Sequence, residues 1–239
     1  MKEKILILGK GESACCFCGM CREAGIAVTQ SDTIGNVGSY LKDASIIVRF
    51  MEDSLDISPV EGAGSVRESQ VWLSESMGES ATAMAKEAGN PERYMGFSLS
   101  GLFPEKKLVE LIGGECTAGD AVATARDLFE KLQFTVVISQ DRAGHIVNRV
   151  VASMINEAVY VSMYGLAQME DIDQMMRLGA NFPMGPFEYA DSVGLDRVLR
   201  TLEWLTEELG PQYRPCPVLR RKVEAGFLGR KTGRGFYTY

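Results

Sequence analysis

The chain has 239 residues, of which 46% are hydrophobic and 24% are charged. This composition excludes a disordered or collagen-like chain, because it supplies enough apolar surface for a folded core. The net charge of −7 argues against nucleic acid or an anionic membrane as partner, so we expect small molecules. No apolar run is long enough for a transmembrane helix, and no signal peptide is evident, so we expect a cytoplasmic protein.

The first part of the chain alternates short β-rich runs with helical stretches, which indicates βαβ units around a parallel sheet. The β-rich runs are 5–8, 46–48, 94–99 and 135–138. After 140–144 the apolar residues recur at helical spacing, as at Ile146, Val150, Met154 and Ala158. The sequence therefore predicts an α/β domain over residues 1–139, followed by an all-helical domain over residues 140–239.

A glycine-rich turn, Gly9-Lys10-Gly11-Glu12-Ser13-Ala14, follows the first expected strand directly. Gly9 permits a tight turn, Gly11 lets the backbone approach a pyrophosphate, and Ala14 is small enough for close packing of helix on strand. The N-terminus of the following helix attracts phosphates. Asp32, after the second expected strand, can bind a ribose diol, which favours NAD over NADP. A glycine turn without a ligand is the alternative, but this context favours a Rossmann-like NAD site.

Four of the six cysteines lie close together, at Cys15, Cys16, Cys18 and Cys21. Their spacing resembles the start of an iron–sulfur motif, but the further cysteine and proline of that motif do not follow Cys21. On a helix, spacings of three would place the thiols along a buried side, where cysteine packs as a small hydrophobe. We predict packing and no metal ion, with metal or thiol chemistry as the alternative.

From Arg93 onward the chain contains several distinctive motifs: Lys107-Leu108-Val109-Glu110, Gly144-His145-Ile146-Val147-Asn148-Arg149, Asn156-Glu157-Ala158, Asp171-Ile172-Asp173, Pro183-Met184-Gly185-Pro186-Phe187, Ala190-Asp191, Gly194-Leu195-Asp196, and the segment 228–237. With these motifs the sequence resembles the 3-hydroxyacyl-CoA dehydrogenases, which are NAD-dependent enzymes of fatty-acid metabolism. The resemblance implies a Rossmann-like domain, a helical domain that forms a homodimer interface, and an acyl-CoA substrate.

The family uses a His-Glu pair, in which the imidazole exchanges a proton with the substrate hydroxyl and the glutamate orients the imidazole. By resemblance, Glu110 is the glutamate, Asn148 contacts the substrate, and Ser98 stands in the position of the histidine. Two further family positions, an asparagine and a serine, are occupied here by Gly101 and Met77. A serine hydroxyl is weakly acidic and needs another base to activate it.

Other departures from the family concern cofactor and substrate binding. The helical hairpin that helps to hold CoA in the family has no room here, because only residues 33–43 separate Asp32 from the next expected strand. Arg49 replaces a carboxylate that lies near the nicotinamide ribose in the family. His145, the single histidine, is expected on the same helix face as Asn148, either as a packed residue or as a substitute for the missing imidazole.

Two functions follow as expectations. The first is an NAD-binding oxidoreductase that transfers hydride between NAD and a 3-hydroxyacyl-CoA substrate, with Glu110, Asn148 and Ser98 in the active site. The alternative is a catalytically inactive homologue that serves as a scaffold for a dinucleotide, an acyl ligand or a partner protein. The losses at Ser98, Gly101 and Met77 motivate this alternative.

Overall fold

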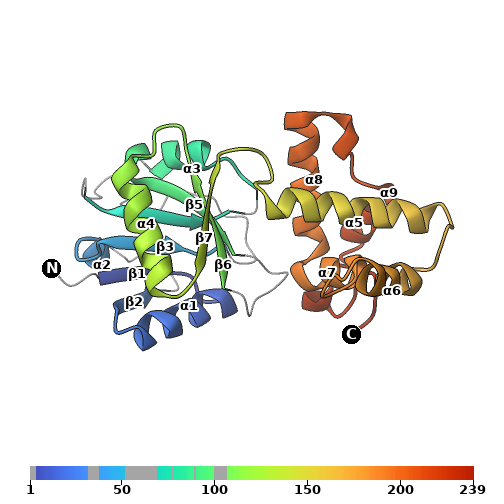
Figure 1. Ribbon diagram of the computed structural model, residues 1–239, viewed down its shortest axis with the longest axis horizontal. Coiled ribbons are helices and arrows are strands. Elements are labelled where there is room, and N and C mark those ends of the chain that lie inside the picture. The colour runs from blue at the N-terminus through green and yellow to red at the C-terminus, as the bar shows by residue number, and fades with distance from the viewer. Residues whose placement is uncertain (1–3, 32–37, 52–68, 77, 89, 100–106) are drawn as a thin grey trace. The chain divides into compact units, whose positions relative to one another are not determined.

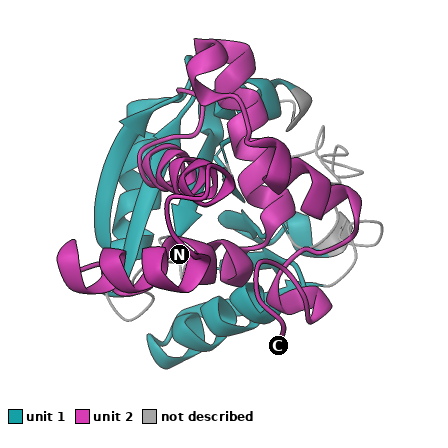
Figure 2. Ribbon diagram, turned by 90° about the vertical axis from the view of Figure 1, so that its right-hand side faces the viewer, with its two compact units in different colours: residues 1–100, 105–141 teal, residues 101–104, 142–239 magenta. Residues whose placement is uncertain are grey.

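The computed structural model describes residues 4–31, 38–51, 69–76, 78–88, 90–99 and 107–239 (Figure 1). The described chain divides into two compact units (Figure 2). The first unit contains the sheet and ends at Asp141, and the second runs from Arg142 to Tyr239 and is built from helices. The predicted fold class, an α/β domain followed by a helical one, is confirmed.

The described strands of the first unit form one seven-stranded sheet in the order β2-β1-β3-β4-β5-β6-β7. Neighbouring strands run parallel except for β5 and β6, which pair antiparallel. The chain moves from β1 to β2 on one side and then crosses to β3 on the other side of β1. The strands are β1 (Lys4–Leu8), β2 (Ala27–Ser31), β3 (Ile46–Arg49), β4 (Val71–Glu75), β5 (Tyr94–Leu99), β6 (Leu108–Gly113) and β7 (Thr135–Gln140).

Helices cover both faces of this sheet. Phe17 of α1 and Phe129 of α4 belong to the core on one face, whereas Leu41 of α2 and Ala85 of α3 belong to the core on the other. Helices on both faces of a mostly parallel sheet are typical of a doubly wound, Rossmann-like unit. The helices are α1 (Glu12–Glu23), α2 (Gly38–Leu41), α3 (Ala81–Ala88) and α4 (Gly119–Lys131), with a 3₁₀ turn at Pro91–Arg93.

The second unit packs its helices around a separate core. In α8, the buried residues Leu195, Val198, Leu202 and Leu205 recur at helical spacing and form its inward face. None of the described helices combines the length and apolar character needed to span a bilayer. The helices are α5 (Val147–Met163), α6 (Met169–Gly179), α7 (Pro186–Val193), α8 (Leu195–Leu209) and α9 (Pro217–Glu224), with 3₁₀ turns at Pro211–Tyr213 and Arg230–Thr232.

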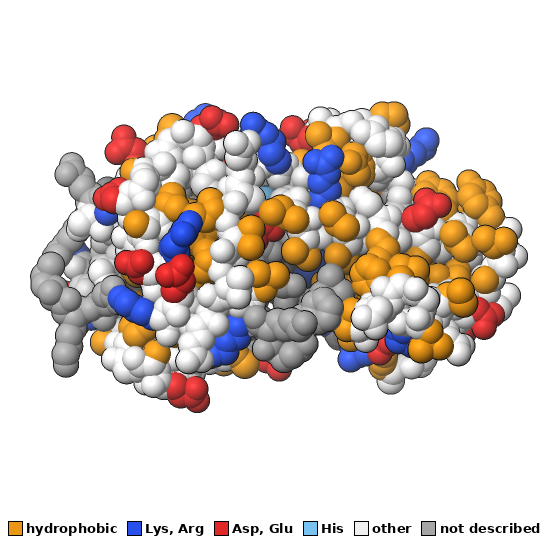
Figure 3. Space-filling view, viewed as in Figure 1, with side chains coloured by type: hydrophobic (Ala, Val, Ile, Leu, Met, Phe, Trp, Pro, Cys, Tyr) orange, Lys and Arg blue, Asp and Glu red, His pale blue; other side chains and the backbone are white. Residues whose placement is uncertain are grey.

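Large apolar side chains are also exposed on this second unit. Tyr164 and Leu166 follow α5 and are 76% and 78% exposed, and Met175 and Leu178 of α6 are 68% and 77% exposed. Figure 3 shows hydrophobic side chains gathered over the α5 and α6 region. These four exposed apolar side chains lie within residues 164–178, and we call them together the α5–α6 surface. Surfaces of this kind mark contact sites in folded proteins.

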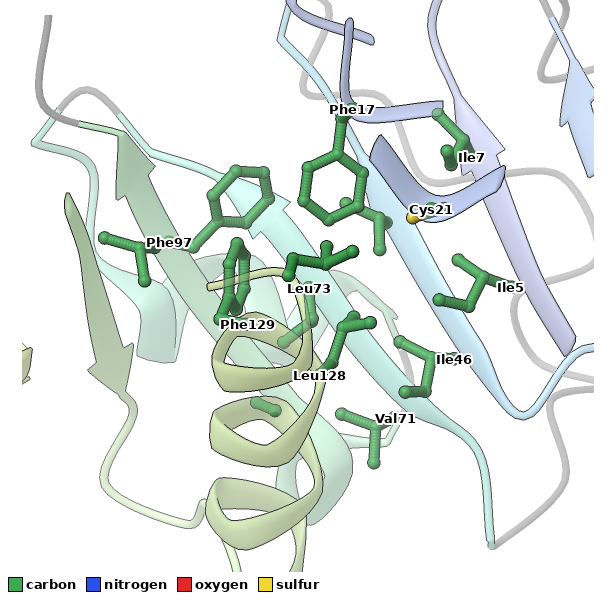
Figure 4. Close-up of a cluster of buried hydrophobic side chains, with 14 of the residues drawn as sticks. Ile5, Ile7, Phe17, Cys21, Ile46, Val71, Leu73, Phe97, Leu128 and Phe129 are labelled. Carbon is green, nitrogen blue, oxygen red and sulfur yellow. The ribbon is translucent and has the colours of Figure 1, made fainter. Parts of the chain in front are cut away.

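The core of the first unit explains why α1 and α4 lie on the same face of the sheet. Phe17, Phe97 and Phe129 are fully buried, and the ring of Phe129 lies 5.7 Å from the rings of both Phe17 and Phe97. Figure 4 shows these rings beside Leu73 and Leu128, with Cys21 near Ile5 and Ile7. Each ring removes a large apolar area from water, so this cluster fixes both helices against the strands.

Candidate functional site

The glycine turn lies between β1 and α1, as the sequence predicts. Gly9 has φ +138°, a conformation that side-chain-bearing residues rarely adopt, and its N–H donates to Ser31 O at 3.0 Å. Gly11 is the N-cap of α1 and has extended backbone, and Ala14 is fully buried against the sheet. The turn thus has the three properties that the sequence pattern requires: a tight corner, a backbone without Cβ, and a small packing residue.

The turn stands where a doubly wound sheet binds ligands. The chain leaves β1 for β2 on one side and returns to β3 on the other, so the strand order reverses at the carboxyl end of β1. Ligands of open α/β sheets bind at such a point. The first-turn N–H groups of α1 lack acceptors within the helix and attract anions. Asp32, the expected ribose-binding residue, lies outside the described residues.

Sequence reasoning missed a further residue of this turn, Gln30 of β2. Its Nε2 donates to Gly9 O at 2.9 Å and lies 3.5 Å from Cys15 Sγ. Gln30 belongs to no sequence motif, and a polar residue within an expected strand does not by itself indicate a functional role. Only the register, which places β2 beside β1, brings Gln30 to the turn.

The cysteine cluster divides into two pairs. Cys18 and Cys21 are buried as predicted, and burial, together with the nearby Cys18, raises the pKa of Cys21 to about 12. The prediction was wrong for Cys15 and Cys16, which are exposed. All six cysteines of the chain are free thiols. Among the described residues, no three His, Cys, Asp or Glu side chains are grouped to hold a metal ion.

Ser98 and Glu110 face one another across the antiparallel pair of β5 and β6. They are directly opposite in the register, and both are buried, at 8% and 5% exposure. Directly opposed residues project from the same face of a sheet, with Cβ atoms about 5 Å apart. Their neighbours Phe97 and Leu111 point into the core on the other face. The sheet therefore brings together the two residues that the family resemblance singles out.

A further buried serine, Ser76, lies beside the strand that carries Ser98. Ser76 follows β4, is 1% exposed, and donates its backbone N–H to Phe97 O at 2.7 Å. Its Oγ donates to Glu79 O at 3.1 Å and accepts the N–H of Gly78 at 3.2 Å. The turn after β4 is therefore held next to the strand that carries Ser98. Met77 and Gly101, where the resemblance indicates lost family residues, lie outside the described residues.

Arg49 ends β3 and pairs in register with Leu8 on one side and Ser74 on the other. The position expected beside a nicotinamide ribose is therefore at the carboxyl edge of the sheet, two strands from β5. Close by, Glu75 accepts the backbone N–H of Met51 at 3.0 Å, which ties the end of β4 to the segment after β3.

In the second unit, Asn148 lies in the first turn of α5 and is partly buried. His145 does not share its helix face, which corrects the sequence expectation. Gly144 and His145 both have positive φ, at +75° and +52°, so α5 begins only at Val147. The His145 side chain is buried, at 5% exposure.

Known proteins resemble this chain in its helical unit and in its sheet unit. The model of the 3-hydroxyacyl-CoA dehydrogenase C-terminal domain matches residues 144–239. A 3-hydroxybutyryl-CoA dehydrogenase of Bradyrhizobium diazoefficiens is 45% identical over 161 residues, which are 67% of this chain and 55% of that protein. The chain thus spans little more than half the length of such relatives. A probable 3-hydroxyacyl-CoA dehydrogenase of Caenorhabditis elegans is 31% identical over 219 residues, covering 90% of this chain and 74% of that one.

The fold agrees with solved structures of the same group. The (S)-3-hydroxybutyryl-CoA dehydrogenase of Ralstonia eutropha superimposes with a TM-score of 0.87 and 28% identity, covering 100% of this chain and 99% of that chain. The match extends over the sheet unit as well as the helical unit, and so includes the glycine turn and the β5–β6 pair. The chain belongs to the 3-hydroxyacyl-CoA dehydrogenase family.

Proposed function

We propose that the protein is an NAD-dependent oxidoreductase that acts on a 3-hydroxyacyl substrate, in the form of a CoA thioester. Residues 1–139 bind the dinucleotide in this proposal, and residues 140–239 contribute substrate and dimer contacts. The observation that carries the proposal is the buried pair of Ser98 and Glu110, in register on one face of the sheet. A serine hydroxyl can release its proton to a carboxylate that lies next to it, so this pair can take part in a proton transfer.

The glycine turn fits the dinucleotide. Gly9 and Gly11 would hold the pyrophosphate through backbone N–H groups, Ala14 keeps α1 close to β1, and Asp32 would bind the adenosine ribose. NAD, when bound, supplies the hydride acceptor. The remaining chemistry falls to the side chains of this chain.

The proton of the substrate hydroxyl passes to Ser98 Oγ in our proposal, while Ser98 releases its own proton to the Glu110 carboxylate. Asn148 binds the substrate oxygen through its amide. Ser98 alone is a weak acid and base, so the exchange depends on Glu110 as the acceptor. Absence of a positioned imidazole typically costs about 10²- to 10⁴-fold in rate, so we expect slow turnover.

The test is oxidation of NADH that depends on acetoacetyl-CoA, measured at high protein concentration against buffer without protein. We expect a saturable rate that Glu110→Gln abolishes. Glu130→Gln, the same exchange at an exposed position of α4, should leave the rate unchanged. A rate that survives Glu110→Gln would remove Glu110 from the proton path.

A second candidate function is a binding protein without turnover. It is favoured by Ser98, which replaces the imidazole of the family, and by Arg49, which places a cation where the family has a carboxylate. Binding of NADH without any acetoacetyl-CoA-dependent rate would support this candidate. Ser98→His then separates two cases: recovered turnover means that the rest of the site is intact, and continued inactivity supports the binding role.

We also propose that the helical unit forms a homodimer through the α5–α6 surface. This surface exposes four large apolar side chains to water, which is unfavourable unless another protein surface covers them: Tyr164, Leu166, Met175 and Leu178. Light scattering should give twice the chain mass for the wild type and the chain mass for Leu178→Glu. Tyr40→Glu, at an exposed apolar position of the first unit, is the control and should stay dimeric. A dimeric Leu178→Glu would move the interface elsewhere.

We also propose a cytoplasmic location, which the free thiols of the chain support. Proteins of oxidising compartments usually pair their cysteines, whereas all six of this chain are unpaired. Fractionation of expressing cells should recover the protein with cytoplasmic markers, and recovery from an oxidising compartment would contradict the assignment.

A further inference from the structure

The first three carbonyls of the glycine turn, those of Gly9, Lys10 and Gly11, each accept a hydrogen bond, and side chains provide two of these three donors. Gln30 Nε2 donates to Gly9 O at 2.9 Å. The Cys15 thiol donates to Lys10 O at 3.5 Å, a usual length for sulfur, and the Cys15 N–H donates to Gly11 O at 3.0 Å. The two side chains also meet, because Gln30 Nε2 lies 3.5 Å from Cys15 Sγ. We call this set of contacts the turn clasp.

The direction of these carbonyls matters for an anionic ligand. Each peptide unit is planar, with its N–H and C=O pointing in opposite directions, so fixing a carbonyl also fixes the N–H of the next residue. A carbonyl turned toward a pyrophosphate repels it, whereas an N–H turned toward it donates a hydrogen bond. The turn clasp holds the carbonyls of Gly9 and Lys10 on protein donors and so fixes the orientation of the peptides that follow them.

Without the two side-chain hydrogen bonds, the carbonyls of Gly9 and Lys10 lose their protein donors, and only backbone contacts hold the turn. Gly9 and Gly11 lack side chains and therefore have more backbone freedom than any other residue. Ordering such a segment when a ligand binds costs conformational entropy, and a turn that is ordered beforehand avoids this loss of affinity. β2 is an edge strand that pairs with β1 in the sheet, and this pairing places Gln30 beside the turn that follows β1.

We propose that Gln30 and Cys15 are positioning residues that preorganise the glycine turn and thereby set the affinity for a pyrophosphate-containing nucleotide. The inference rests on the proposed dinucleotide function. It also gives the exposed Cys15 a role distinct from the packing of Cys18 and Cys21 and from the adjacent, exposed Cys16.

The experiment measures the dissociation constants of NADH and of ADP-ribose by calorimetry for the full chain and four variants. Cys15→Ala and Gln30→Leu each remove one side-chain hydrogen bond from the turn, and should weaken both ligands about 3- to 10-fold. Cys15→Ser keeps a donor at the same position and should restore most of the affinity. Cys16→Ala is the matched control and should bind as the wild type does.

Thermal unfolding of every variant shows whether a loss of affinity is a loss of fold. We expect midpoints close to the wild type for Cys15→Ala and Cys15→Ser, because Cys15 is exposed. If the wild type binds NADH and both Cys15→Ala and Gln30→Leu bind it within about 2-fold as tightly, the positioning role of the turn clasp is wrong. The dinucleotide function would be unaffected by that result. A wild type that binds neither NADH nor ADP-ribose would overturn the dinucleotide function, and the positioning role with it.

Discussion

Asp141 caps α3, and replacing it by alanine should destabilise the first unit measurably. Its carboxylate accepts the hydroxyl of Ser80 at 2.8 Å, the N–H of Ala81 at 2.9 Å and the N–H of Thr82 at 2.8 Å. The two N–H groups belong to the first turn of α3, which has no acceptors for them within the helix. Because Ala81 is fully buried, water does not readily replace the lost carboxylate.

The size of the effect follows from these contacts. Loss of an N-cap acceptor costs about 1 kcal/mol, and hydrogen bonds to a charged group contribute about 1.5 to 3 kcal/mol. For Asp141→Ala we therefore expect a decrease of about 2 to 4 kcal/mol in the free energy of unfolding. Asp141→Asn keeps one acceptor oxygen and should lose about half as much. Asp127→Ala, at an exposed position of α4, removes the same charge and should have little effect.

Urea unfolding, followed by circular dichroism, measures these differences, and its pH dependence provides a second check. Partial burial opposes ionisation of Asp141, but hydrogen bonds from Thr82, Ser80 and Ala81 outweigh it and lower the pKa in the folded protein. The stabilisation is therefore complete above the ordinary aspartate pKa of about 4 and is lost as the pH falls through the lowered value. A difference between wild type and Asp141→Ala that is below about 1 kcal/mol, or that grows on acidification, would refute this reasoning.

Three further predictions concern packing and thiol access. Gly235→Ala should cost about 2 to 3 kcal/mol in urea unfolding, because an added Cβ would overlap the buried Asp191 carboxylate; an unchanged midpoint would contradict the contact. Tyr237→Phe removes the hydroxyl that donates to Asp173 Oδ2 at 2.9 Å and should cost about 1 to 2 kcal/mol in the same assay; full stability would show that this bond contributes nothing. A thiol reagent should modify the three exposed cysteines of the native protein quickly and the three buried ones, Cys21 included, only in denaturant. The exposed residues are Cys15, Cys16 and Cys116. Fast reaction of more than three thiols would contradict the burial of the other three cysteines.

The fold and the glycine turn were predictable because their signals are local. A strand followed at once by glycines and a helix needs no information from the rest of the chain. The pairing of Ser98 with Glu110 came from resemblance to the family, since neither residue has a distinctive neighbourhood in the sequence. Gln30 was not predictable, because its contact with Gly9 depends on the pairing of β2 with β1.

The cysteines show where helical spacing misleads. A helix has 3.6 residues per turn, so a step of three falls about 60° short of a full turn. Cys18 and Cys21 remain within the buried arc of α1, but Cys15 is displaced by two such steps from Cys21 and reaches solvent. For His145, the apolar periodicity gave no sign that the left-handed backbone at 144 and 145 delays the start of α5.

The register of β5 and β6 bears on how this site can change over generations. Hydrogen bonds to β4 on one side and β6 on the other fix the backbone of β5 around position 98, whichever side chain stands there. An exchange of the side chain at position 98 therefore leaves these backbone hydrogen bonds in place. Chemistry at such a position can be lost, altered or regained within a lineage without a new fold having to arise.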